Sequence, residues 1–128
     1  MKNEFVTYDL ALRMKELGYN EPCFGYYEHN TKELDTISSE VCERLCKHTT
    51  HIKAPTYQSA FAWFRDKCGL HSYLSPKLSY PDDYITGEYY INILCNKFDY
   101  DVDGDGVYLY EEAQEACLEK LCEIVEKN

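Results

Sequence analysis

The sequence lacks several features that would assign it to a class at once. No apolar run approaches the roughly 18 residues of a membrane-spanning helix. No export signal opens it, since Met1 to Glu4 lead straight into a helix pattern. It contains no phosphate-binding glycine loop and no G-x-S-x-G elbow around a nucleophilic serine. We therefore expect a protein that is not a membrane protein; an enzyme is disfavoured but stays open, and no catalytic residue is assigned.

Basic side chains are also scarce. Thirteen lysines and arginines face 23 aspartates and glutamates, which gives a net charge of −10. A chain of this charge repels phosphate backbones and anionic membranes, so we expect no nucleic-acid and no membrane partner. A basic protein partner, a cation or simple solubility would each fit the charge.

Size and composition predict one globular domain over residues 1–128. Apolar residues make up 45% of the chain and charged residues 28%, as in ordinary folded domains. The seven cysteines are an odd number, so at least one thiol stays free or pairs between chains. Thiols without an export signal indicate a reducing compartment, and we expect the cytoplasm.

The periodicity of apolar residues predicts an α+β fold. Thr7 can cap a helix that Gly18 ends, and Pro55 suits the first turn of a second helix. We expect a small, mainly antiparallel sheet of three to four strands, with about three helices packed chiefly on one face. The expected helices are 8–17, 56–68 and 111–127, with a further short one at 40–47, and the expected strands are 23–28, 70–75, 88–97 and 107–110.

The pattern also predicts which side chains form the core. Within the helix 56–68, Trp63 lies off the apolar face, so we expect it to be partly exposed. The predicted core consists of Phe61, Phe64, Ile91, Ile93, Leu121 and Ile124.

Tyrosine is unusually frequent, with 13 residues. Its ring is apolar and its hydroxyl polar, so tyrosines either edge a core or form a recognition surface. The final helix adds a ridge of glutamates that is either a solvated face or a surface for a basic partner. The candidate binding residues are Tyr89, Tyr90, Tyr108, Glu115 and Glu119.

The segment 101–112 matches the calcium-loop pattern D-x-D-x-D-G-x5-E. Asp101, Asp103, Asp105 and Glu112 would supply hard oxygen ligands. However, the preceding segment 89–98 alternates like a strand, whereas a calcium hand needs a helix there. The alternative is a β-hairpin, with an acidic glycine turn over 99–106 and no metal.

Two further clusters suggest ligands more weakly. Cys42, Cys46, His48 and His51 are zinc-ligand types, but their spacing is tighter than in structural zinc sites. Lys53, Arg65, Lys67 and Lys77 are the cations that could hold a small anionic ligand such as a nucleotide signal.

Three blocks of the chain resemble a family of small uncharacterised proteins common in phages and mobile elements of gut Bacteroidales. The blocks are 21–27 (EPCFGYY), 54–65 (APTYQSAFAWFR) and 110–121 (YEEAQEACLEKL), and the likeness extends over most of the chain. The family implies no established activity, so it assigns no catalytic residue. The resemblance implies two strands, joined by a variable turn, before the final helix. This arrangement disfavours a calcium site.

Three functional hypotheses follow. The first is a phage or mobile-element accessory protein that binds a host protein in the host cytoplasm through the acidic, tyrosine-rich surface. The second is a protein that sequesters a nucleotide signal. The third is a calcium-binding module that uses the loop 101–112.

Overall fold

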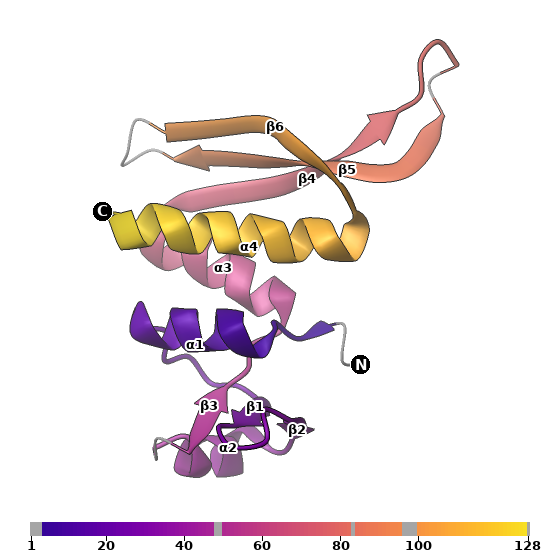
Figure 1. The fold of residues 1–128 in the computed structure, drawn as a ribbon. Helices are drawn as coiled ribbons and strands as arrows, with labels where there is room; N and C mark the ends of the chain where they lie inside the picture. The colour runs from indigo at the N-terminus through magenta and orange to yellow at the C-terminus, as the bar shows by residue number, and fades with distance from the viewer. Residues whose placement is uncertain (1–3, 48–49, 83, 96–99, 128) are drawn as a thin grey trace. The chain divides into compact units, whose positions relative to one another are not determined.

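The computed structural model describes residues 4–47, 50–82, 84–95 and 100–127, and for 100–107 it describes the backbone alone. The chain forms two compact units, Met1–Ala60 and Phe61–Asn128, which are described separately here (Figure 1). The α+β prediction is confirmed, since helices accompany two antiparallel sheets of three strands each. The expected strands are thus divided between two sheets.

Unit 1 has a small sheet flanked by helices. The antiparallel sheet has the order β2-β1-β3, with the central Tyr27 opposite Leu34 on one side and Ile52 on the other. Its elements are α1 (Tyr8–Glu16), β1 (Gly25–Glu28), β2 (Leu34–Thr36), α2 (Ser39–Leu45) and β3 (His51–Lys53). The strands β2 and β3 lie in segments that the sequence pattern assigned to a loop and a connector.

The predicted helix signals at α1 are confirmed. The Thr7 side chain accepts a hydrogen bond from the Leu10 N–H at 3.3 Å, as an N-cap does. Gly18 adopts φ +101°, a left-handed conformation that favours glycine just after a helix. Leu10, Ala11 and Met14 of this helix are buried, and α1 packs against β3.

Close packing around β1 explains a second glycine. A Cβ built on Gly25 would lie 2.5 Å from Phe5 Cε1 and 3.1 Å from the Ala54 carbonyl oxygen. Nearby, the buried Tyr27 hydroxyl donates to the Val6 carbonyl oxygen at 2.6 Å. The segment before α1 is therefore fixed to the sheet by sterics and by a hydrogen bond.

Unit 2 contains a longer sheet and the last helix. The antiparallel sheet has the order β4-β5-β6, so β5 is central. Its elements are β4 (Leu70–Leu78), β5 (Ile85–Cys95), β6 (Tyr100–Leu109) and α4 (Tyr110–Lys127), while α3 (Tyr57–Cys68) begins in unit 1 and continues into unit 2. The strands β4 and β5 extend through much of 75–87, which the sequence assigned to a loop.

Helix α4 packs against all three strands of this sheet (Figure 1). It contributes the predicted core residues Leu121 and Ile124, together with Ala113 and Cys117, and all four are buried. Buried sheet residues meet them from strands β4 and β5, namely Leu70, Ile91 and Ile93. The core prediction is confirmed except at Phe61, which is only half-buried.

The prediction for Trp63 was wrong. Its side chain is only 8% exposed, and its ring meets that of Phe64 edge-on at a centroid distance of 5.0 Å. The helical spacing places Trp63 beside the apolar face of α3. Its large indole ring nevertheless extends over the neighbouring apolar side chains and is buried with them.

The turn predicted over 99–106 was also wrong where the structure describes it, because β6 is continuous from Tyr100 to Leu109. Residue 99 lies outside the described residues. The register shows how the glycine-rich segment stays in the sheet. Ile93 pairs with Val102, Ile91 with Asp105 and Tyr89 with Tyr108, so between these pairs β6 twice advances three residues while β5 advances two. Two extra residues are thus accommodated as bulges near Gly104 and Gly106, where glycine tolerates the local backbone.

Candidate docking surface

The negative charge of the chain is concentrated in unit 2. Residues 61–128 contain 14 acidic and six basic side chains, a net charge of −8, whereas residues 1–60 contain nine and seven, a net charge of −2. A surface for a basic partner is therefore to be sought on unit 2.

The sheet of unit 2 has one covered and one open face. Alternation along the strands places Leu70 and Ser72 of β4 with Ile91 and Ile93 of β5 on the face toward α4. The thiol of Cys117 on α4 makes a hydrogen bond with Ser72, which fixes this assignment. The opposite face, named the open face here, carries His71, Tyr73, Ser75, Tyr90, Asn92 and Leu94.

Aromatic and aliphatic side chains are exposed on the open face. Tyr73 is 53% exposed and Leu94 is 47% exposed, although both lie within regular strands. His71, the register partner of Leu94, is exposed as well. Exposed apolar side chains on neighbouring strands are the feature that marks protein-binding surfaces.

A buried amide holds the open face in shape. The Asn92 side chain is 3% exposed, and its Nδ2 donates to the Tyr73 carbonyl oxygen at 3.3 Å and to Ser75 Oγ at 2.9 Å. These bonds tie β4 to β5 directly beneath Tyr73. The exposed ring is therefore displayed from a rigid backbone, which lowers the entropy lost on binding.

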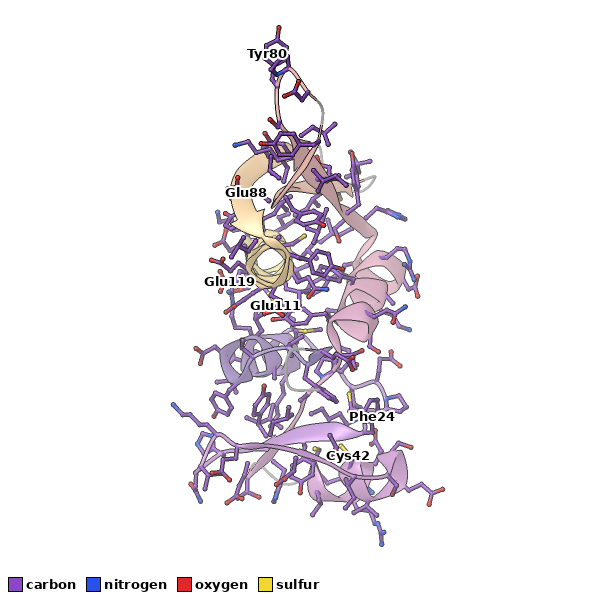
Figure 2. The ribbon with its side chains drawn as sticks, turned by 90° about the vertical axis from the view of Figure 1, so that its right-hand side faces the viewer. Phe24, Cys42, Tyr80, Glu88, Glu111 and Glu119 are labelled. Carbon is purple, nitrogen blue, oxygen red and sulfur yellow. The ribbon has the colours of Figure 1, made fainter. Side chains whose placement is uncertain are left out.

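The hairpin that joins β4 and β5 carries more exposed apolar side chains. Leu78 pairs with Ile85 in the register, and the Ser79 N–H donates to the Tyr84 carbonyl oxygen at 2.9 Å. The segment Leu78–Ile85, named the arm here, extends beyond α4 (Figure 1), and Tyr80 stands at its tip with 94% exposure (Figure 2). The predicted strand begins only at residue 88, so the sequence did not predict this arm.

The structure separates the predicted tyrosines. Tyr89 and Tyr108 face each other in the register on the α4 side, and the Tyr89 ring lies edge-on to Tyr110 at 5.2 Å. Tyr90 lies on the open face opposite Ser75, and it shares this face with Tyr73 and Leu94, which the sequence interpretation did not include. All three predicted tyrosines are half-buried.

The predicted glutamates lie on α4, which covers the other face of the sheet. Glu119 is exposed (Figure 2). Glu115 is half-buried. Of the five predicted binding residues, Tyr90 alone therefore belongs to the open face.

The calcium prediction stays a prediction. The backbone of Asp101, Asp103 and Asp105 is extended in β6, and the carboxylates of these residues lie outside the described side chains. Glu112 is exposed in the first turns of α4. Within the described part of the chain, no group of three potential ligands could hold a metal ion.

The cysteines suggested for zinc lie in unit 1. Cys42 Sγ lies 3.9 Å from Cys46 Sγ and 3.5 Å from the Gly25 carbonyl oxygen. Burial raises the pKa of Cys46 to about 12 in the metal-free chain. His51 lies on β3 with its Nδ1 2.9 Å from the Thr50 hydroxyl, and His48 lies outside the described residues.

The cations considered for an anionic ligand mostly have acidic partners. Lys53 contacts Glu43, Arg65 lies 3.2 Å from Asp66, and Lys77 lies 4.0 Å from Glu88. Beside Lys53, unit 1 contains a cavity of about 50 Å³. Sites for small-molecule ligands usually measure about 300–1,000 Å³, so this cavity does not favour a nucleotide.

Comparison of the chain with protein-family models, with curated proteins and with solved structures gives no match. Among the described helices, none is both long and apolar enough to cross a membrane.

Proposed function

We propose that this chain is a small accessory binding protein, without enzymatic activity, that masks a basic surface of a host protein in the cytoplasm. A phage or mobile-element origin is part of the proposal and rests on the resemblance of the three sequence blocks. The binding surface is the open face of unit 2, including Tyr90 from the predicted set.

The exposure of Tyr73 and Leu94 on the open face is the observation that carries this proposal. Aromatic residues presented from a rigid strand supply large contact area at low entropic cost. The surrounding unit has a net charge of −8, which would steer a basic partner toward it and repel acidic ones. Together these features favour a basic protein surface with an apolar centre.

The test is affinity capture from a lysate of a gut Bacteroidales host, with quantification of the retained proteins. The perturbing variant is Tyr90→Ser/Leu94→Ser, which removes apolar area from the central strand β5. The matched control is Ile37→Ser in unit 1, where another aliphatic side chain is 38% exposed.

We expect a basic protein to be retained by the wild type and by Ile37→Ser, and lost with the double variant. Retention should also fall as salt is raised from 0.05 to about 0.5 M, because salt screens the charge attraction. Identical retained proteins for wild type and double variant, with both folded by circular dichroism, would refute the proposal.

A further inference from the structure

The two edges of the unit 2 sheet differ in how they are protected. An edge strand exposes unpaired N–H and C=O groups, and proteins commonly guard it with charges, bulges or short length. β6 has two bulges and contains Asp101, Asp103 and Asp105 in its sequence. β6 is therefore guarded against strand addition.

The other edge, β4, has none of these protections over its first six residues, Leu70–Ser75. Its register with β5 is unbroken from Leu70↔Cys95 to Pro76↔Tyr89. The nine residues of β4 include no aspartate or glutamate, within a unit of net charge −8. The edge strands of unit 1, β2 and β3, have three residues each, so β4 is the long, regular and acid-free edge among the described strands.

The backbone groups on the outer side of β4 can be assigned. Pro76 has no N–H to donate to β5, which places its nitrogen on the outer edge, as is usual for proline in a sheet. By the period of two, the N–H groups of Leu70, Ser72 and Leu74 face outward as well. Between described residues, no backbone hydrogen bond outside the helices and sheet ladders involves Leu70–Leu78.

We propose that β4 pairs with β4 of a second copy of this chain, so that two unit 2 sheets join into one antiparallel six-stranded sheet. Charge favours a second copy here, because the acidic residues of unit 2 lie on other elements and β4 brings only His71 and Lys77. Lys77 lies 4.0 Å from Glu88 of its own chain, which offsets its charge. This inference does not depend on the proposed host partner.

The stretch available for pairing fixes where the two-fold axis lies. Pro76 ends the regular edge, so the pairing stretch is Leu70–Ser75 and its centre falls at Ser72 or Tyr73. In either register, Tyr73 lies within one residue of the axis. The two exposed Tyr73 rings would then meet each other directly, or meet His71 of the other copy, on the open face.

The experiment measures the dimer dissociation constant by sedimentation equilibrium, with a phosphine reductant to exclude disulfide-linked dimers. We expect dimers in the wild type. Tyr73→Glu should weaken the dimer by about tenfold or more, because it places like charges beside the axis. Tyr84→Glu on the arm is the matched control, since Tyr84 is 59% exposed, and it should dimerise like the wild type.

A charge swap makes the test specific for the axis. Tyr73→Lys should also be a weak dimer alone, but an equimolar mixture of Tyr73→Lys and Tyr73→Glu should form heterodimers. If Tyr73→Glu fails to fold, Tyr73→Lys and Tyr84→Glu still give the comparison. A monomeric wild type at 100 μM, or a dimer indifferent to both Tyr73 variants, would overturn the proposal.

Discussion

The Cys117 thiol makes the stability of unit 2 depend on alkaline pH in a way that can be calculated. Cys117 is fully buried between α4 and the sheet, and burial raises its pKa from 9.0 to about 12, although the hydrogen bond with Ser72 acts in the opposite direction. In the unfolded chain the thiol ionises from about pH 9, whereas in the folded chain it stays neutral to about pH 12.

The sign of the effect follows from proton binding. Between these two pKa values the unfolded state holds fewer protons than the folded state, so the free energy of unfolding falls as pH rises. The slope is about 1.4 kcal/mol per pH unit. From pH 8 to pH 10.5, Cys117 should therefore remove about 2 kcal/mol of stability.

Cys117→Ala isolates this contribution. At pH 8 the variant should be about 1 kcal/mol less stable than the wild type, because it leaves a small cavity. At pH 10.5 the order should reverse by about the same amount, since the variant lacks the thiol that destabilises the wild type. Other titrating groups are present in both proteins and cancel in the comparison.

Urea unfolding followed by tryptophan fluorescence measures this directly, because the chain has one tryptophan and Trp63 lies in unit 2. Ile91→Val is the control, since it also removes one buried methyl-sized group but nothing that titrates. Its stability difference from the wild type should be the same at both pH values. If Cys117→Ala also shows a constant difference, the thiol is not desolvated as the structure indicates.

Substitutions at three positions test the packing and capping of unit 1, with stability followed by hydrogen exchange of its strand amides. Gly25→Ala should destabilise the unit by about 1–3 kcal/mol, because the new methyl group would overlap the Phe5 ring; unchanged exchange would contradict this packing. Tyr27→Phe should cost about 1–3 kcal/mol, since it leaves the buried Val6 carbonyl without its 2.6 Å donor; a neutral result would mean that water replaces the hydroxyl. Thr7→Ala should cost about 1 kcal/mol and Thr7→Ser almost nothing, because a hydroxyl at the N-cap is the feature that matters.

The helices could be predicted because their signals are local. Thr7 and Gly18 mark the two ends of α1 by side-chain capping and by a left-handed backbone, and both depend only on neighbouring residues. The apolar spacing of α4 likewise identified its buried face. Short strands such as β2 and β3 offer too few residues for an alternation to be recognised.

The prediction for β6 failed because local and long-range preferences disagree there. Asp-Gly pairs favour turns, and Gly104 and Gly106 lie in such pairs. Pairing with the buried strand β5 keeps the segment extended, and the bulges absorb the residues that do not fit. The partner strand therefore decides whether this segment forms a turn or a strand, and a local sequence pattern carries no information about that partner.

The candidate surface was only partly predictable for a related reason. Alternation along β5 correctly separates Ile91 and Ile93 from Tyr90 and Leu94, but alternation alone does not tell which side a helix will cover. From the sequence, Tyr89, Tyr90 and Tyr108 could therefore be grouped only by residue type, whereas the strand register divides them between the two faces of the sheet. Tyr73 was missed because a single aromatic residue in a short strand gives no signal of its own.

Strand pairing at β4 would affect the proposed binding of a host protein, although neither proposal depends on the other. Strand pairing at β4 would place the two open faces side by side in one sheet, so that each dimer presents the surface with Tyr90 and Leu94 twice. A partner with two or more matching sites would then bind the dimer more tightly than a monomer, because the first contact raises the effective concentration for the second. Tyr73→Glu should therefore weaken the capture of such a partner in two ways, by separating the two copies and by replacing a ring of the open face, whereas Tyr90→Ser/Leu94→Ser should abolish capture while the dimer remains. Capture unaffected by Tyr73→Glu would show that binding needs neither the Tyr73 ring nor the pairing at β4, and would contradict the proposed surface.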